Sequence, residues 1–256
     1  MRRLLIRPGA VGDFIVSLPA LESLRGDYTE VWCAEQNVPL ARFADRAQSI
    51  ISAGLDRVGL LPADDVMERL RSFDSIISWY GTTRPEFRAL VASLPFQFLP
   101  ALPSNLNQHA VDFYNAQILR LVPAQNGYAT NPSRFPQIRC PAARRSFAVI
   151  HPFASSVRKR APMEVFQTMA DRLSPLMPVH WLCGPEEELA GAIRVDDLYE
   201  LACSLSHAHI FVGNDSGISH LAAAVGTPVM VFFLSTEARV WVPRGPAVNV
   251  HNIGAN

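Results

Sequence analysis

Three short segments of this chain combine residue types that could bind and activate a phosphorylated substrate. The first, Arg7–Asp13, follows an apolar run and places one carboxylate, Asp13, close to the start of a predicted helix. The second is a polar loop that carries hydroxyl and basic side chains together. The third, Gly213–Gly217, joins an apolar run to a segment rich in alanine. Each segment therefore sets polar groups where a strand is predicted to pass into a helix.

The segment Gly213–Gly217 is expected to bind an anion. Its two glycines can adopt positive φ, and a helix is predicted directly after it over Ile218–Val225, ended by Gly226. The first N–H groups of a helix lack partners within the helix and point outward with the positive end of its dipole, which suits a phosphate or diphosphate. The alternative is that Asp215 and Ser216 only cap this helix, since caps are common at any helix start.

The polar loop after a predicted strand at Phe147–Ile150 has the composition of an anion site. Lys159 is the only lysine of the chain, and every other cationic side chain apart from histidine is arginine. A compact ammonium and a planar guanidinium are not interchangeable where one charge must reach a phosphate oxygen. We therefore expect Lys159 to contact phosphate, the alternative being a solvated loop charge. The other anion-binding candidates of the loop are Ser155, Ser156, Arg158 and Arg160.

The first segment favours acid–base chemistry over nicotinamide chemistry. Gly9 and Gly12 do not complete the Gly-x-Gly-x-x-Gly dinucleotide fingerprint. Asp13 is either a helix cap or a general base that faces a cleft. His220 lies one turn beyond Ser216 and either faces the phosphates or packs between two halves of the protein.

Alternating apolar and helical segments predict two α/β units that position these residues. The first opens as a strand–helix–strand unit within about 30 residues, and the second follows a linker predicted near Arg139–Ser146. Open α/β sheets bind ligands beyond the carboxyl ends of their strands, so the three segments are expected to face a cleft between the units. The predicted elements are Leu4–Ile6, Phe14–Leu24, Glu30–Cys33, Ser75–Trp79, Ala110–Leu121, Phe147–His151, Val179–Leu182, Leu198–Leu205, Ile210–Val212 and Val229–Phe233.

Composition narrows the class of protein. The 256 residues allow one large or two smaller α/β domains. A net charge of zero and a pI near 7.1 argue against a general nucleic-acid-binding surface. No apolar run reaches the roughly 18 to 20 residues of a membrane span, and Met1–Leu21 is too interrupted for a signal peptide, so a cytoplasmic location is expected. Without a Cys-x-x-Cys pair, core thiols are predicted at Cys33, Cys140, Cys183 and Cys203.

The three segments together resemble glycosyltransferase family 9, the ADP-heptose:lipopolysaccharide heptosyltransferases. They read RPGAVGDFIVSLPAL, HPFASSVRKRAPMEVF and VGNDSGISHLAAAVGTPVMVFF, in the order and spacing of the family. Weaker similarity at His109–Tyr114, Leu198–Leu205 and Thr236–Gly245 extends the resemblance over most of the chain. It implies an α/β GT-B fold, two Rossmann-like domains with parallel sheets facing across a cleft. Residues 1–143 would bind the acceptor and residues 144–256 the nucleotide sugar.

The resemblance also implies an activity. Heptose or a related sugar would move, with inversion, from a nucleotide-diphosphate donor such as ADP-heptose to a lipopolysaccharide-core or other glycan acceptor, without a metal or other cofactor. Asp13, beside Gly9 and Gly12 on the acceptor-side loop, would take the proton of the acceptor hydroxyl. The resemblance assigns donor contacts to Lys159, Asp215, Ser216, Gly217 and His220. It also matches Glu200 to a glutamate that contacts the ribose of the donor.

The chain departs from the family pattern at three places. The stretch Ile193–Asp196 is much shorter than in family members, which place another loop and strand there. Leu234-Ser235 replaces a Gly-Pro pair, and the family's C-terminal helical segment would follow Asn256. Two alternatives therefore stay open: a non-catalytic module that binds a nucleotide sugar, and a nucleotide-sugar epimerase or hydrolase on the same architecture. A glycolipid acceptor would add peripheral contact with the cytoplasmic face of the inner membrane.

Overall fold

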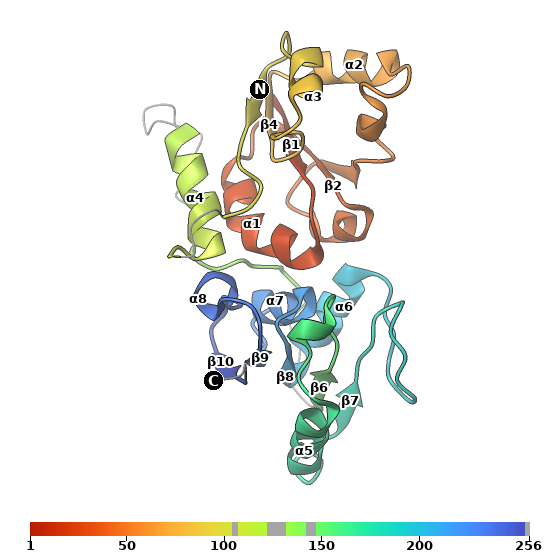
Figure 1. The fold of residues 1–256 in the computed structure, drawn as a ribbon, viewed down its shortest axis with the longest axis vertical. Coiled ribbons are helices and arrows are strands. Elements are labelled where there is room, and N and C mark those ends of the chain that lie inside the picture. The colour runs from red at the N-terminus through yellow and green to blue at the C-terminus, as the bar shows by residue number, and fades with distance from the viewer. Residues whose placement is uncertain (104–106, 122–131, 142–146, 254–256) are drawn as a thin grey trace.

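Two α/β halves, one above the other, make up the protein (Figure 1). The computed structural model describes residues 1–103, 107–121, 132–141 and 147–253. Each half contains a five-stranded sheet in which every pair of neighbouring strands is parallel. The strand order is β3-β2-β1-β4-β5 in the N-terminal sheet and β10-β9-β8-β6-β7 in the C-terminal sheet. The predicted α/β class with two parallel sheets is therefore confirmed.

The N-terminal sheet is centred on β1, whose residues are apolar because both of its faces are covered. Leu4, Leu5 and Ile6 are completely buried. A continuous apolar run of this kind is typical of a central parallel strand. The elements of this half are β1 (Arg2–Arg7), α1 (Val11–Ser23), β2 (Tyr28–Cys33), the 3₁₀ turns η1 (Glu35–Leu40) and η2 (Leu55–Arg57), β3 (Arg46–Ser49), α2 (Asp64–Arg71), β4 (Ser75–Ser78), α3 (Pro85–Leu90), β5 (Phe96–Phe98) and α4 (Ala110–Leu121).

The C-terminal sheet is centred on β8, which has β6 on one side and β9 on the other. Gly213 within β8 has no room for a side chain, because a Cβ there would lie 2.7 Å from the Phe211 ring and 3.2 Å from the His151 carbonyl oxygen. The elements of this half are β6 (Phe147–His151), the 3₁₀ turn η3 (Val157–Lys159), α5 (Met163–Leu173), β7 (Val179–Trp181), α6 (Leu198–Ser206), β8 (Ala208–Asn214), α7 (Gly217–Ala224), β9 (Val229–Phe233), α8 (Ala238–Trp241) and β10 (Val248–Asn252).

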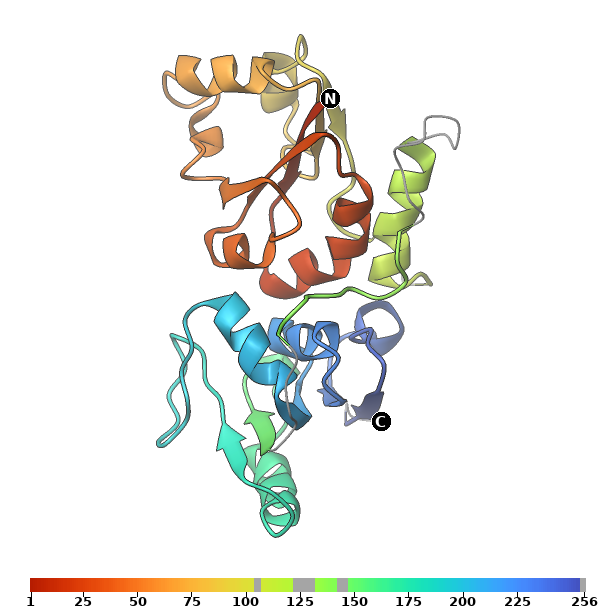
Figure 2. The same cartoon turned by 180° about the vertical axis from the view of Figure 1, so that it is seen from behind.

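Helices join the two halves. The helix α1 packs against α4 in its own half and against α7 in the other half. One cluster of buried apolar residues crosses this seam and includes Phe14 and Leu18 of α1 with Leu221 and Ala222 of α7. The chain from 132 to 141 follows the seam (Figure 2), and the N–H of Ile138 donates to the Ala224 carbonyl at 3.0 Å. The seam is therefore a packed interface over much of its length.

Several expectations at the level of elements need correction. The first helix begins at Val11 and not at Phe14, so Asp13 lies in its first turn. Gly213 and Gly217 do not adopt positive φ, whereas Gly226, with φ of 80°, ends α7 as expected. Two of the four predicted core thiols, those of Cys140 and Cys203, are only half-buried.

The shortened stretch near Ile193 leaves little structure at the edge of the C-terminal sheet. A single parallel bridge joins Leu182 to Ile193 beyond β7, and the chain then passes directly into α6. Residues 142–146 of the predicted linker lie outside the described residues. No helix among the described ranges is long and apolar enough to cross a membrane.

Candidate functional site

Lys159 and Asp215 form an ion pair at the carboxyl end of the C-terminal sheet. The Lys159 Nζ donates to Asp215 Oδ2 at 2.8 Å, and the side chain of Thr236 donates to the same oxygen at 2.6 Å. The side chain of Asp215 is 5% exposed and that of Lys159 is 29% exposed. The pair therefore presents an amine near the surface above a buried carboxylate.

Asn214, which the sequence analysis did not single out, fixes the loop that carries Lys159. This residue is fully buried at the end of β8. Its Oδ1 accepts from the N–H of Ala161 at 2.9 Å, and its Nδ2 donates to the Pro152 carbonyl at 2.8 Å. An amide side chain can bridge two backbone groups in this way because it both donates and accepts. Both ends of the loop are thereby tied to the strand that precedes Asp215.

The other loop candidates bind their own loop. Ser155 is exposed, and Ser156 Oγ accepts from the N–H of Arg158 at 3.3 Å. Arg160 Nε donates to the Ala154 carbonyl at 2.9 Å, and its guanidinium lies 5.5 Å from the centre of the Phe153 ring. Of the three cations in this loop, Lys159 is the one whose side chain binds Asp215, the residue directly after β8.

The start of α7 is not capped by a side chain. Ser216 is the N-cap residue, but its side chain makes no capping hydrogen bond and lies 3.4 Å from Ser219 Oγ. Asp215 uses its Oδ2 to bind Lys159 and Thr236. The interpretation that Asp215 and Ser216 only cap this helix is therefore wrong. The positive end of the α7 dipole lies beside the Lys159–Asp215 pair.

Asp13 lies half-buried in the first turn of α1, in the N-terminal half. Its Oδ2 accepts from the N–H of Ala10 at 3.1 Å, so the carboxylate does help to close the start of the helix. Gly9 has a φ of 114°, and a Cβ there would lie 3.0 Å from both Cβ and Oδ2 of Asp13. Only glycine fits this turn, because other residues rarely adopt such a φ.

Arg7 is a second residue that the sequence analysis did not identify as functional. It is 1% exposed and donates to the carbonyl oxygens of Pro8 at 2.8 Å and Asp13 at 2.9 Å, and to the Tyr114 hydroxyl at 2.8 Å. Burial lowers the pKa of Arg7, while the Tyr114 hydroxyl and the Asp13 carboxylate oppose that change. Arg7 thus holds both ends of the turn that presents Asp13.

The starts of α1 and α7 touch at two glycines. A Cβ on Gly217 would lie 2.8 Å from Val11 Cβ and 3.0 Å from the Gly12 backbone nitrogen. A Cβ on Gly12 would lie 3.3 Å from the His220 ring. The contact brings Asp13, the next residue after Gly12, close to the segment that begins at Asp215.

His220 packs in this contact as a neutral group. Its residue is 5% exposed, and burial lowers the pKa of its imidazole to about 4, although the nearby Asp215 carboxylate opposes the shift. A histidine with this pKa carries no charge at neutral pH. His220 therefore fills the seam rather than supplying a cation.

Glu200 is exposed in the first turn of α6, where its N–H donates to Asp197 Oδ1 at 2.9 Å. Within the described ranges, no hydrogen bond or ion pair joins its side chain to the Lys159–Asp215 pair. The neighbouring Tyr199 faces the seam instead, with its hydroxyl donating to the Arg139 carbonyl at 3.1 Å and the Arg42 guanidinium 4.1 Å from its ring centre.

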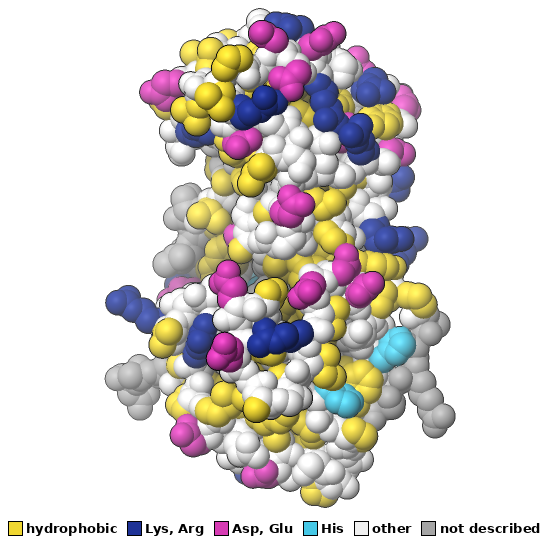
Figure 3. All heavy atoms as spheres, turned by 90° about the vertical axis from the view of Figure 1, so that its right-hand side faces the viewer, with side chains coloured by type: hydrophobic (Ala, Val, Ile, Leu, Met, Phe, Trp, Pro, Cys, Tyr) yellow, Lys and Arg dark blue, Asp and Glu magenta, His cyan; other side chains and the backbone are white. Residues whose placement is uncertain are grey.

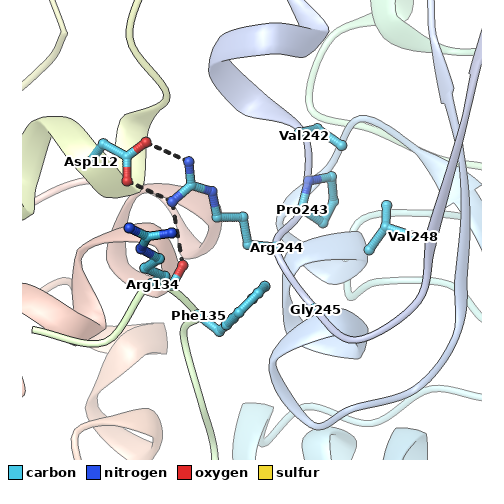
Figure 4. A pocket seen from close by; sticks show the side chains of 8 residues that line it. All are labelled: Asp112, Arg134, Phe135, Val242, Pro243, Arg244, Gly245 and Val248. Atoms are coloured by element: carbon cyan, nitrogen blue, oxygen red, sulfur yellow. Dashed lines mark hydrogen bonds and ion pairs between the residues drawn. The ribbon is translucent and has the colours of Figure 1, made fainter.

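Cavities also lie along the seam. The one in Figure 4, about 680 Å³, lies between α4 and the segment after α8. Arg244 spans it, with hydrogen bonds of 2.7 and 2.5 Å to the two carboxylate oxygens of Asp112. The Arg244 guanidinium lowers the pKa of Asp112. None of the residues predicted to bind donor or acceptor lines this cavity or the two others described, of about 820 and 360 Å³.

Acidic and basic side chains lie on the surface on both sides of the seam between the halves (Figure 3). They do not gather into a metal centre in the part of the chain that the structure describes: no three His, Cys, Asp or Glu side chains there are placed to hold a metal ion.

Two parallel Rossmann-like sheets meeting through helices define a GT-B glycosyltransferase fold. The chain belongs to glycosyltransferase family 9 (heptosyltransferase), whose profile matches residues 103–255. Lipopolysaccharide heptosyltransferase 3 of Escherichia coli strain K12 is 31% identical over 117 residues, which cover 38% of this chain and 33% of that protein. The chain spans about a third or less of the curated relatives that it matches.

Solved structures show the same fold. The E. coli heptosyltransferase WaaC, solved with ADP, is 19% identical, with a TM-score of 0.73 over 98% of this chain and 93% of that chain. The E. coli ADP-heptose lipopolysaccharide heptosyltransferase II is 16% identical, with a TM-score of 0.74 over 98% of this chain and 90% of that chain.

Proposed function

We propose that this chain is an inverting glycosyltransferase that moves heptose, or a related sugar, from ADP-heptose to a lipopolysaccharide-core or other glycan acceptor. The observation that carries the proposal is the contact of Gly12 with Gly217. Asp13 follows Gly12 in one half, and Asp215, the partner of Lys159, lies two residues before Gly217 in the other. A base and a phosphate-binding cation on opposite sides of a seam suit a reaction between two substrates. That WaaC was solved with ADP and with ADP-2-deoxy-2-fluoro heptose supports the donor class.

The chemistry needs few groups. The acceptor hydroxyl oxygen attacks the anomeric carbon of the sugar, and Asp13 accepts the hydroxyl proton. The bond from that carbon to the diphosphate oxygen breaks, and its electron pair leaves with the nucleoside diphosphate. Attack from the face opposite the leaving group inverts the configuration. The Lys159 ammonium and the start of α7 stabilise the charge that develops on the diphosphate, so the proposal invokes no metal.

The other residues have supporting roles in this proposal. Residues 1–143 bind the acceptor and residues 144–256 the donor, with a boundary that lies outside the described residues. Ser155, Ser156 and Arg160 line the phosphate side of the donor, while Ser216 and Gly217 offer backbone N–H groups. Glu200 meets the ribose once the donor is bound. We place the protein in the cytoplasm, in peripheral contact with the membrane that carries a glycolipid acceptor.

A second candidate function is a module that binds the nucleotide sugar without transferring it. Two observations favour it. A single bridge, Leu182–Ile193, replaces the extra strand that the family resemblance implied. Lys159 is also already paired with the Asp215 carboxylate, with which a donor phosphate must compete.

Mass spectrometry of mixtures of donor, acceptor and protein distinguishes the two candidates. We expect a product heavier than the acceptor by one heptosyl residue, formed only when both ADP-heptose and a core glycolipid or glycan acceptor are present. Binding of ADP-heptose by calorimetry without any such product would favour the binding module. Loss of the sugar from the donor without acceptor would instead indicate a hydrolase.

A further inference from the structure

The 820 Å³ cavity at the opposite end of α1 from Asp13 has the character of a binding site. Its walls come from the end of α1, the chain after η1, the segment 132–139 and the first turn of α6, so both halves contribute to it. Figure 2 shows this segment passing between α1 and the C-terminal half. Glu22 in its wall is nine residues beyond Asp13, which corresponds to about 14 Å along a helix. The cavity is thus separate from the proposed transfer site.

Three arginines line this cavity, Arg25, Arg42 and Arg139. None of them takes part in the ion pairs between described residues, and no side-chain hydrogen bond is formed by their guanidinium groups within those ranges. Their three positive charges face one lining carboxylate, that of Glu22. The end of α1 adds about half a negative charge. A net charge of roughly +1.5 therefore remains.

All three arginines are exposed, and a ring holds the guanidinium group of one of them, Arg42, at the cavity wall. The Arg42 guanidinium lies over the Tyr199 ring, 4.1 Å from its centre. Tyr199 in turn donates to the carbonyl oxygen of Arg139. Burial raises the pKa of Glu22, while the positive charges of Arg139 and Arg25 oppose that rise. Guanidinium groups are the usual partners of phosphate, because they donate in pairs.

We propose that this cavity binds a phosphate-bearing ligand with at least two negative charges, held by Arg42 and Arg139 with Arg25 at the rim. Its volume is in the range of small-molecule sites. Ser133 and Gln137 supply further polar groups in the wall. Because the walls come from both halves, an occupant would also bridge them. The site is additional to donor and acceptor binding.

Pyrophosphate serves as the probe ligand. All measurements use the variant Lys159→Gln as the parent protein, because the Lys159 loop of the wild type would bind pyrophosphate as well. Calorimetry should detect pyrophosphate binding to Lys159→Gln. Adding Arg42→Gln or Arg139→Gln should weaken that binding at least about tenfold, the usual effect of losing one charge-assisted hydrogen bond. Adding Arg172→Gln, an exposed arginine of α5 far from the cavity, should leave it unchanged. Thermal melting of each variant establishes that it is folded.

Cosedimentation with vesicles containing phosphatidic acid distinguishes the source of the phosphate. Cosedimentation that requires Arg42 and Arg139 would assign the cavity to a lipid headgroup, and pyrophosphate binding without cosedimentation would assign it to a soluble phosphate. The proposal is overturned if folded Lys159→Gln binds neither probe, or if Arg42→Gln and Arg139→Gln bind as well as Arg172→Gln.

Discussion

Gly217 at the start of α7 lies against Gly12 at the start of α1, so close that a Cβ on Gly217 would stand 3.0 Å from the Gly12 backbone nitrogen. Two helices from different halves thereby meet at their N-terminal ends. Each end carries a partial positive charge. The region around this contact consequently suits negative groups, and both Asp13 and Asp215 lie beside it.

The two glycines should respond differently to an added methyl group. Gly217→Ala should lower the free energy of unfolding by about 1–3 kcal/mol, because the new Cβ would lie 2.8 Å from Val11 Cβ. Gly12→Ala should be much milder, since its closest contact is the His220 ring at 3.3 Å and alanine favours the helix. Urea denaturation measures both. If Gly217→Ala lowers the free energy of unfolding as little as Gly12→Ala does, the two helix starts separate readily.

Lys159 should dominate the affinity for ADP. Removal of a charged donor to phosphate in Lys159→Ala should weaken ADP binding by about 10- to 100-fold. Lys159→Arg should restore it only in part, because a planar fork replaces a point charge. Arg158→Ala is the matched control, since that exposed side chain shares the loop. If calorimetry gives Lys159→Ala the same affinity as Arg158→Ala, Lys159 only pairs with Asp215 and does not contact the donor.

His220 should make the protein sensitive to acid. Its pKa of about 4 in the folded state lies below the ordinary 6.5, so the unfolded chain binds the additional proton as pH falls from 6.5 to 4. Stability from this group is therefore complete above pH 6.5 and is lost progressively below it, by up to about 3 kcal/mol. His220→Gln should flatten this part of the stability profile, whereas exposed His209→Gln should not. A profile with the same slope in His220→Gln as in wild type would count against a buried neutral imidazole.

The Arg244–Asp112 pair should contribute modestly to the joining of the halves. Asp112→Asn should lower the free energy of unfolding by about 1 kcal/mol, because the pair is bidentate but partly exposed. Asp65→Asn removes a more exposed pair with Arg57 inside one half and should cost less. Denaturation at low and high salt compares the two variants. If both variants lose the same free energy of unfolding, the bidentate geometry of the Arg244–Asp112 pair adds nothing to stability.

The sequence predicts the central strands and the adjacency of the Lys159 and Asp215 loops well, for a physical reason. The loops that carry Lys159 and Asp215 follow β6 and β8, which are neighbours in the sheet, so their carboxyl ends must lie side by side. Central parallel strands are also continuous apolar runs, and these are easy to recognise. The edge strands β3, β5 and β10 were not predicted, because they are short or mixed in polarity.

The remaining parts of the site depend on packing between segments that are distant in sequence. Thr236 binds Asp215 only because β9 lies beside β8. The positive φ expected at Gly213 and Gly217 was wrong because the glycines there provide space for close approach rather than a turn. The role of Arg7 depends on Tyr114 of α4, a contact that no local pattern reveals.

The central claim is that Asp13 is the base of a transfer reaction whose donor is bound by the other half. Its most direct test is the rate of acceptor glycosylation by Asp13→Asn, followed by mass spectrometry together with calorimetry of ADP binding. Asparagine keeps the size of the side chain and can still accept the Ala10 N–H, but it is no useful base. Turnover should fall by roughly 10²-fold or more at nearly unchanged ADP affinity and melting temperature. Wild-type turnover in Asp13→Asn, or a parallel loss of ADP binding and thermal stability, would contradict the claim.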